Sequence, residues 1–318
     1  MTLTPAFRFG PLMMALICIV GAWAPEVASA DQISTSDRDL RRAPALGETA
    51  DARATNRSQA RQRPAPRANE GPVFPWTNEE LFYSVRMAGS EAMRAVLRTG
   101  RLQNSGNREY IPINGVARSR GFFHAIYPVD DKANTFFDPV SGRPLHSEKV
   151  FDENDRFRRY TVDYRHQDYT ARVERKRNNR LARFKSRIPG ETHDMITWLY
   201  DLRRTPNMSM GDEFSYYIYD GWLLSRVDLK VVDREDLLTP MGWFKTWRLD
   251  YTREIMDTDD DDDSDVGPPS TFIEEQARHS GSIWLSRDAN LLPVRVTIDT
   301  MLGAGEAVLI RYTPGSPQ

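Results

Sequence analysis

The stretch PGETHDMITWLYDLRR, Pro189 to Arg204, interrupts a sequence whose other apolar residues mostly alternate along the chain. Its own apolar residues recur at helical spacing instead, at Met195, Ile196, Leu199 and Leu202. Thr192 is a suitable N-cap, and Arg203 and Arg204 come late, where the helix dipole favours cations. The pattern predicts one amphipathic helix over Glu191 to Arg204, and such a helix must bury its apolar stripe against a sheet.

The residues on either side of this stretch follow a period of two, which is typical of β-strands. Leu81, Tyr83 and Val85 alternate with other residues before a turn at Gly89, and a second alternating run follows, so the spacing predicts a hairpin. The pair Asp220-Gly221 suits a two-residue hairpin loop, because both residues tolerate positive φ. Further strands are expected at 214–219, 223–232, 283–285, 293–299 and 306–312.

Strands at this spacing predict a mainly β fold. We expect a curved antiparallel meander, either a half-barrel or an open barrel, with one packed amphipathic helix. A chain of about 250 residues buries roughly 70–75% of the surface that it exposes when unfolded. The segment 71–318 is therefore long enough to form a single β-rich domain.

The first thirty residues have the pattern of a cleavable signal peptide. Arg8 precedes an apolar run from Pro11 to Ala24, and the small residues Ala28 and Ala30 fit a signal peptidase site, so cleavage is expected after Ala30. A transmembrane anchor is the alternative, but the run is shorter than the ~20 residues that span a bilayer. The sequence thus predicts a periplasmic protein with no transmembrane span after signal cleavage.

Cys18 is the single cysteine and lies inside this leader. The exported chain would hold no thiol, which excludes disulfides, thiolate metal sites and a cysteine nucleophile. The formal net charge of −2 favours neither a nucleic-acid partner nor a membrane.

Two segments are too polar to fold by themselves. Residues 31–70 contain arginine, proline and alanine with no aromatic residue, so we expect a disordered linker. Residues 256–270 carry a dense acidic run, which predicts a solvated loop insertion. Oxygen ligands at this density could bind calcium, but the run lacks the glycine and the closing glutamate of an EF-hand.

The stretch from Phe122 to Leu145 holds one histidine and three aspartates, which raises the question of a catalytic cluster. Asp130 and Asp131 are neighbours in a predicted strand, so their side chains should point to opposite faces of the sheet. Asp138 precedes a proline and is expected to accept hydrogen bonds from the backbone of its turn. A strand followed by a turn is the simpler interpretation.

Familiar catalytic and metal-binding motifs are absent from the sequence. The histidines at 146, 166, 193 and 279 do not have the spacing of a zinc motif, and no nucleophile elbow, phosphate-binding loop or dinucleotide fingerprint occurs. We therefore predict no catalytic residue, no metal site, no cofactor and no enzymatic activity.

A cationic face is the most informative surface predicted. On three successive predicted strands between 156 and 187, the residues that face one side of the sheet are mostly apolar, and those that face the other side are mostly basic. We call the second side the basic face; its cations are Arg159, Arg165, Arg172, Lys176, Arg183, Lys185 and Arg187. Like charges on neighbouring strands repel by ~0.2–1 kcal/mol for each close pair, and a bound polyanion would relieve this repulsion. The alternative is a solvated sheet edge that its charges protect from aggregation.

Three separated phrases resemble one bacterial envelope family. They are Tyr127 to Asp131 with the strand end at Phe137, Leu238 to Arg248, and Ile283 to Ser286 followed by Leu292 to Arg295. Their order and spacing are similar to the family catalogued as domain of unknown function number 3108, over about Pro75 to Thr313. The acidic insertion and the arginine-rich linker depart from the family pattern.

The resemblance implies a β-rich exported domain related in shape to the half-barrel lipoprotein carriers. In those carriers a curved sheet forms a hydrophobic concavity that a helix plugs. No catalytic residues are established for the family, so none is carried over. Trp243, Trp247 and Trp284 lie within the matching phrases and would line a sheet face, in a core or beside an apolar ligand.

The leading interpretation is a non-enzymatic periplasmic binding or carrier protein for an apolar or lipid-like anionic envelope component. The concave face would hold an acyl chain, and the basic strands would meet an anionic headgroup or surface. An alternative is a structural or assembly factor that binds a protein partner or a cell-wall polymer. A third is a hydrolase of envelope polysaccharide, which would need two carboxylates facing each other across a cleft at ~5–10 Å.

Overall fold

The computed structural model describes residues 74–316, except residues 88, 107, 155, 179, 259–277 and 300–304. The predicted signal peptide, the linker over 31–70 and most of the acidic loop at 256–270 lie outside the described residues. In the part of the chain that is described, no helix is long and apolar enough to cross a membrane.

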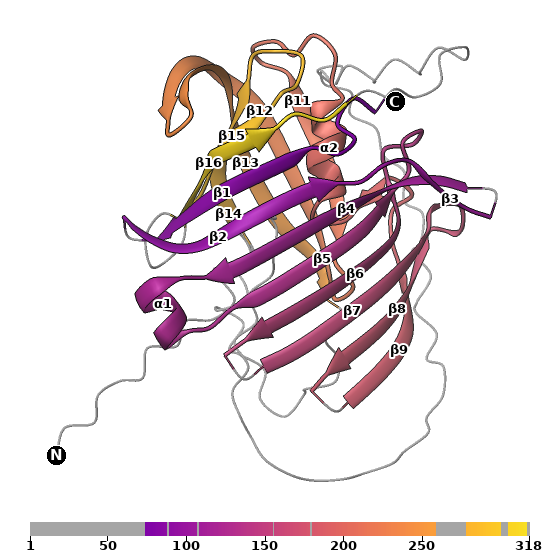
Figure 1. Ribbon diagram of the computed structural model, residues 1–318. Coiled ribbons are helices and arrows are strands. Elements are labelled where there is room, and N and C mark those ends of the chain that lie inside the picture. The colour runs from indigo at the N-terminus through magenta and orange to yellow at the C-terminus, as the bar shows by residue number, and fades with distance from the viewer. Residues whose placement is uncertain are drawn as a thin grey trace, which may run out of the picture.

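One large sheet of 16 strands contains nearly all of the regular structure (Figure 1). The strands follow the order β10-β11-β12-β13-β14-β15-β16-β1-β2-β4-β5-β6-β7-β8-β9, and β3 pairs with β4 beside this path. Their bounds are β1 Glu80–Met87, β2 Ser90–Thr99, β3 Gln103–Ser105, β4 Arg108–Ser119, β5 Asp130–Phe137, β6 Pro144–Glu153, β7 Arg156–Arg165, β8 Thr170–Arg177, β9 Arg180–Arg187, β10 Thr192–His193, β11 Glu213–Tyr219, β12 Leu223–Thr239, β13 Gly242–Thr258, β14 Arg278–Ser286, β15 Pro293–Ile298 and β16 Gly305–Thr313.

Neighbouring strands are antiparallel with one short exception. β10 pairs parallel to β11, through Thr192 with Tyr217 and His193 with Ile218. The predicted antiparallel meander is confirmed for the rest of the sheet. The turns predicted at Gly89 and Gly221 also form, and both glycines have the positive φ values that such turns require.

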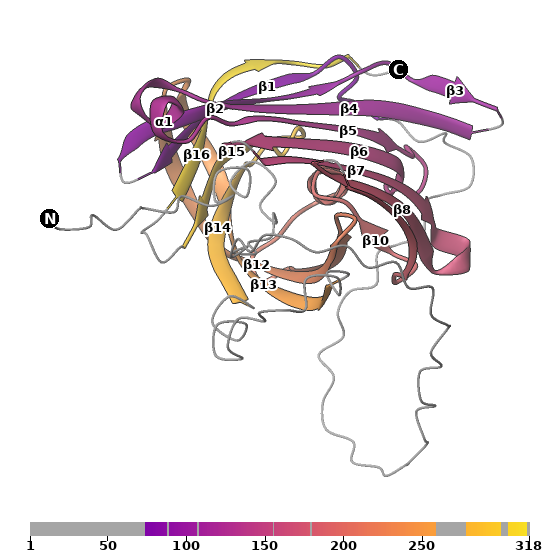
Figure 2. The same cartoon turned by 90° about the horizontal axis from the view of Figure 1, so that it is seen from below.

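The sheet curls into an open half-barrel, with β4–β8 on one side and β12–β14 on the other (Figure 2). Most buried apolar side chains form one cluster on its inner face. A second cluster connects β7–β9 to β11 and β12. There Tyr164 donates to the Tyr219 carbonyl at 2.8 Å, and the Tyr219 hydroxyl donates to Ser186 Oγ at 2.8 Å. Side chains therefore hold the two ends of the sheet together, although β9 and β10 remain its edges.

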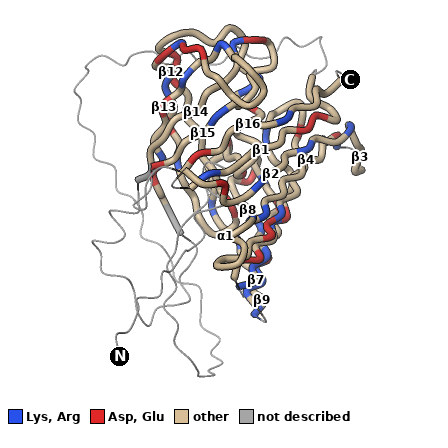
Figure 3. The backbone as a smooth tube through the Cα atoms, turned by 60° about the vertical axis from the view of Figure 1, so that its left-hand side comes forward, with Lys and Arg blue, Asp and Glu red and all other residues tan. Residues whose placement is uncertain are grey.

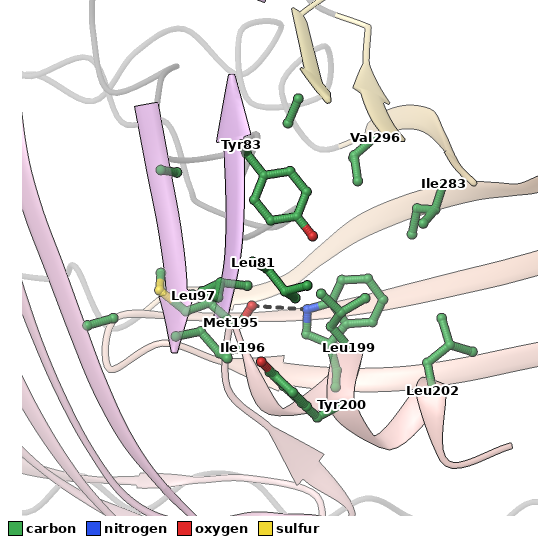
Figure 4. Close-up of a cluster of buried hydrophobic side chains, with 14 of the residues drawn as sticks. Leu81, Tyr83, Leu97, Met195, Ile196, Leu199, Tyr200, Leu202, Ile283 and Val296 are labelled. Carbon is green, nitrogen blue, oxygen red and sulfur yellow. Dashed lines mark hydrogen bonds between the residues drawn. The ribbon is translucent and has the colours of Figure 1, made fainter. Parts of the chain in front are cut away.

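The helix α2, Thr197–Arg203, plugs the inner face, and all seven of its residues are buried. Figure 4 shows its apolar side chains beside Leu81, Tyr83 and Leu97 of the first two strands. The prediction of one packed helix in a curved sheet is thus confirmed. The prediction of an amphipathic helix was incomplete, because Asp201 and Arg203 are buried as well.

The predicted helix boundaries and N-cap were wrong. Thr192 lies in β10 and donates to the Pro189 carbonyl, so it caps nothing. The N-cap position is held by Ile196, which makes no side-chain cap bond; two residues earlier, Asp194 Oδ1 accepts hydrogen bonds from the N–H groups of Ile196 at 2.9 Å and Thr197 at 2.8 Å. Pairing of β10 with β11 keeps the preceding residues extended, which delays the start of the helix by six positions relative to Glu191.

A second short helix, α1 Gly121–Ile126, lies between β4 and β5 and was not predicted. None of its residues is buried, and Phe122 and Ile126 are exposed. Helical periodicity cannot be recognised in six residues, so this element could not be predicted from the pattern of apolar residues.

Candidate functional site

A buried ion pair fixes the C-terminal end of α2. Arg203 donates from Nη1 and Nη2 to the two carboxylate oxygens of Glu79, at 2.7 and 2.6 Å. Both side chains are fully buried, and Arg203 also lies over the Trp76 ring, with Cζ 4.3 Å from the centroid. Burial works to lower the pKa of Arg203, but the charge and hydrogen bonds of Glu79 together outweigh burial and raise it. Arg203 therefore stays charged in the core.

A groove with a volume of about 590 Å³ opens beside this ion pair, at the end of α2. Four segments line it: 75–76, 203–208, Trp247 of β13, and the β14–β15 turn at 287–291. The residues that give it chemical character are Trp76, Arg203, Arg204, Met208, Trp247 and Arg287. Indole, thioether and guanidinium groups together suit a ligand that is partly apolar and partly anionic.

Arginine and tryptophan are stacked in the groove wall. The guanidinium carbons of Arg234 and Arg287 lie 4.5 and 5.1 Å from the centroid of Trp247. The adjacent Asp288 is occupied by its own turn, since it accepts hydrogen bonds from Ser286 Oγ and the Asn290 N–H. Arg287 is exposed, and no ion pair joins it to an acid among the described residues. It is therefore the cation best placed to meet an anionic ligand.

A second buried polar group lies below the start of α2. Lys149 donates to Asp220 Oδ1 at 3.2 Å, and the same carboxylate oxygen accepts the N–H of Met195 at 3.0 Å. Burial raises the pKa of Asp220, although Lys149 and Arg253 oppose this. Burial also lowers the pKa of Arg253 to about 10. Asp220 was predicted only as a turn residue, whereas it joins the turn, the sheet and the helix.

The aspartates of the 122–145 stretch form a strand and a turn, as predicted. Asp138 Oδ1 accepts the N–H groups of Val140 at 2.8 Å and Ser141 at 3.3 Å. Asp130 is partly exposed and paired with Arg118, whereas Asp131 is fully buried, so the two point to opposite faces.

Asp131 meets Glu153 of the next strand, an acid that the sequence did not single out. Both carboxyl groups are buried, and Glu153 also accepts a hydrogen bond from Arg158. Burial raises the pKa of Asp131 well above its usual value, with the charge of Glu153 adding to it, and burial raises the pKa of Glu153 too. Such a pair is stable when it shares a proton. The sequence could not show it, because it depends on the β5–β6 register.

The seven predicted cations of the basic face are all exposed on β7–β9. Figure 3 shows the Lys and Arg positions along these strands in blue. Arg159 lies opposite Lys176, and Arg172 lies opposite Lys185. Two of the seven form ion pairs with acids of the same face: Arg159 with Glu148 at 3.4 Å and Arg183 with Glu174 at 2.7 Å. The basic face lies outside the groove, and Arg159 lies over the ring of Phe157, with Cζ 6.0 Å from the centroid.

The three tryptophans of the matching phrases do not share one face. Trp247 pairs with Leu285 and Trp284 with Arg248, so these two indoles point to opposite sides of the sheet. Trp243 is 72% exposed near the end of the β12–β13 hairpin. Among the described residues no three His, Cys, Asp or Glu side chains are grouped closely enough to hold a metal ion.

Comparison with known proteins identifies a family and finds distantly similar solved structures. Residues 83–310 match the family described as protein of unknown function, DUF3108. A beta-barrel-like protein of the domain of unknown function DUF1849, from Brucella abortus, is 12% identical, with a TM-score of 0.48 over 76% of this chain and 98% of that one. A protein with a YmcC-like fold from Bacteroides fragilis is 10% identical, with a TM-score of 0.33 over 75% and 97% of the two chains. None of the curated proteins matches the chain.

Proposed function

This chain belongs to the DUF3108 family of proteins of unknown function, and we propose that it is a non-enzymatic binding or carrier protein of the cell envelope. Its ligand is an amphipathic anion: an apolar body with a carboxylate, sulfate or phosphate head. The periplasmic location rests on the leader predicted over residues 1–30.

The groove at the end of α2 is the observation that carries this proposal. Its volume of about 590 Å³ falls within the ~300–1,000 Å³ of small-molecule sites. Trp76, Met208 and Trp247 line the groove with apolar groups, of which 2%, 7% and 8% is exposed, and Arg287 offers an exposed guanidinium, which binds carboxylates and phosphates with two parallel hydrogen bonds. An apolar chain along the indoles with its head at Arg287 satisfies both kinds of surface.

The buried helix determines where such a ligand binds. Because α2 and the apolar cluster around it are buried on the described inner face, we place the ligand in the groove at the helix end. The groove is built on the Glu79–Arg203 ion pair and on strand β13, so its walls are rigid. A preformed site loses less entropy on binding than a flexible one.

The acids of the described chain support binding over hydrolysis. A glycoside hydrolase needs two carboxyl groups separated across an open cleft, at ~5–10 Å. Asp131 and Glu153 are instead buried in direct contact with each other, and neither lines the groove. The Asp131–Glu153 pair therefore affects the stability of the sheet through its protonation state, and it does not line the groove where a ligand would bind.

Native mass spectrometry of protein freshly purified by mild extraction tests the proposal. The wild type should carry an adduct with the mass of a single-chain anionic amphiphile. Arg287→Ala should lose most of that adduct. Arg311→Ala is the matched control, because Arg311 also lies over an aromatic ring, that of Phe82, with Cζ 3.5 Å from the centroid, but lines no part of this groove. A wild-type spectrum without any adduct would count against a resident ligand.

The basic face favours a second candidate, an assembly factor that binds an acidic envelope polymer or protein. Directly opposed cations at Arg172 and Lys185 cost stability unless an anion lies between them. The double change Arg172→Gln, Lys185→Gln should raise the stability of the free protein and weaken its retention on an anionic polymer. Arg226→Gln, Lys230→Gln is the control, since these cations already have acidic partners in Asp228 and Glu213. Equal retention of both variants would eliminate this candidate.

A further inference from the structure

The hairpin of β12 and β13 extends beyond the rest of the sheet (Figure 1, orange). β11 pairs with β12 no further than Lys230, and β14 pairs with β13 no further than Thr246. Val231 still exchanges backbone hydrogen bonds with Gly211 and Asp212, and the Lys245 carbonyl accepts one from Arg287; between these residues and the turn at Thr239 and Gly242, the backbone hydrogen bonds described for the two strands are only to each other. The end of the hairpin is therefore a free two-stranded ribbon.

The end of this ribbon is apolar and uncharged. Residues 237–244 read LLTPMGWF, with Asp236 and Lys245 as the nearest charges on either side. Leu238 is 62% exposed, Met241 37% and Trp243 72%, and Leu238 lies directly opposite Trp243. Large apolar side chains exposed together at one projecting point mark an interaction site. We call Leu238, Met241 and Trp243 the hairpin tip.

The turn at the tip satisfies its own polar groups. Thr239 Oγ1 accepts the N–H of Met241 at 3.1 Å and donates to the Gly242 carbonyl, also at 3.1 Å. Gly242 has φ of 109°, a conformation that a side chain would strain. A turn with few unpaired backbone groups can enter an apolar phase at low cost.

We propose that the hairpin tip inserts into the interfacial region of a phospholipid bilayer. Tryptophan is enriched at that interface because its ring is apolar and its N–H is polar. A tip of three side chains is far smaller than the ~800 Å² that each partner buries in a stable protein complex, but it suits a deformable lipid surface. The flanking Asp236 and Lys245 balance each other, so apolar burial and not charge attraction supplies the affinity.

The tip is continuous with the groove. Every second residue of β13 faces the same side of the ribbon, which places the side chains of Trp243, Lys245 and Trp247 on one face. Trp247 also lines the groove. The N–H of Arg287 bonds to the Lys245 carbonyl at 2.8 Å, which fixes the groove loop to the same ribbon. A tip in the bilayer would bring the groove to the membrane surface. The insertion itself does not depend on what the groove binds.

Site-specific fluorescence tests this inference. Cys18 is the only cysteine, so in a full chain with Cys18→Ser, Met241→Cys can be labelled with an environment-sensitive nitrobenzoxadiazole group. With vesicles of phosphatidylethanolamine and phosphatidylglycerol, its emission should shift to the blue and persist at high salt. Leu102→Cys is the control, because Leu102 is exposed to nearly the same extent as Met241, 38% against 37%, but lies between β2 and β3, outside this ribbon and outside the basic face. Because the label reports only its own position, membrane binding by another segment cannot produce the signal.

The same vesicles test the tip by partitioning. In the labelled chain, Leu238→Ser with Trp243→Ser should weaken the partitioning that the label at position 241 reports at least tenfold, or by about 1.4 kcal/mol. Phe122→Ser on α1, another exposed aromatic residue, should leave it unchanged. An unshifted label at position 241 in the presence of excess vesicles would overturn the proposal. A shift produced by a protein from the envelope fraction, and not by vesicles, would also overturn it and identify a protein partner.

Discussion

Arg203 and Glu79 stand 124 residues apart in the chain and form a two-bond ion pair that is fully buried. The pair joins the end of α2 to the segment that leads into β1, and its Arg203 side lines the groove. Two charges removed from water in this way are stable only when each keeps its partner.

The first prediction concerns this ion pair. Glu79→Gln leaves the Arg203 charge uncompensated in the core and should lower the free energy of unfolding by about 3–5 kcal/mol. The neighbouring Glu80 forms an exposed ion pair with Arg98, at 2.7 Å, so Glu80→Gln should cost less than about 1 kcal/mol. Urea unfolding followed by circular dichroism measures both. Equal effects of the two variants would show that the buried pair has no special role.

A double replacement separates the charge from the packing. Glu79→Leu combined with Arg203→Met removes both charges and keeps apolar volume, so it should recover much of the stability lost in Glu79→Gln. If the double variant is less stable than the single one, the network around Tyr200 and Asn290, which also bond to this pair, contributes more than the charges do.

The second prediction is a pH dependence with opposite signs at two adjacent aspartates. Asp131 has a pKa raised by burial and by Glu153, above an ordinary value of 3.8. The folded state therefore holds the Asp131 proton more tightly than the unfolded chain does. The protonated carboxyl group contributes to the free energy of unfolding in full below pH 3.8, and this contribution is lost as the pH rises through the pKa of the folded state. Asp131→Asn lacks the dependence, so its stability relative to wild type should increase from about pH 4 to about pH 7.

Asp130 is the control for that measurement. The hydrogen bonds and charges of Arg118 and Lys132 outweigh its partial burial and lower the pKa of its carboxyl group. Its contribution to the free energy of unfolding is present above the ordinary value of 3.8 and is lost as the pH falls below it, so Asp130→Asn should lose stability relative to wild type as the pH rises to about pH 4 and change little from there to about pH 7. Thermal unfolding at a series of pH values distinguishes the two slopes, and slopes of the same sign would contradict the assignment.

Local features of the sequence predicted the local structure well. Asp138 and its turn, the hairpins at Gly89 and Gly221, and the opposite faces of Asp130 and Asp131 all depend on residues within a few positions of one another. The curved sheet and its one buried helix followed from the same period-two and helical patterns.

Features that depend on strand register could not be predicted. The contact of Asp131 with Glu153 and the ion pair of Glu79 with Arg203 require pairings between segments that no local spacing reveals. The groove is the clearest example, because its four segments meet only when the sheet curls around α2. The two tryptophans of the groove, Trp76 and Trp247, are visible in the sequence, but nothing in their spacing shows that they lie together.

The third prediction concerns the start of α2. Asp194 accepts two N–H groups of the first helical turn and the Thr135 hydroxyl, so Asp194→Ala should lower the free energy of unfolding by about 2–4 kcal/mol. Thr192→Val removes only the bond to the Pro189 carbonyl and should cost about 1 kcal/mol. Chemical denaturation of both variants measures the difference, and the reverse order would restore Thr192 as the cap.

The fourth prediction concerns ligand affinity in the groove. With palmitate as the probe, Arg287→Ala should weaken binding about tenfold, because it removes a charge-assisted contact worth about 1.5 kcal/mol. Arg287→Lys should weaken it less, since the charge remains while the two-bond geometry is lost. Arg311→Ala should leave it unchanged. Isothermal titration calorimetry gives these affinities, and an unchanged Kd in Arg287→Ala would remove Arg287 from the site.

Cross-linking with a photoreactive fatty acid tests the central claim most directly, because it reports where an amphipathic anion binds. After irradiation and digestion, the account predicts labelled peptides that contain Met208, Trp247 or the 287–291 turn, and competition by unlabelled palmitate. Labels confined to the outer side of β7–β9, or labels that unlabelled palmitate does not reduce, would contradict it.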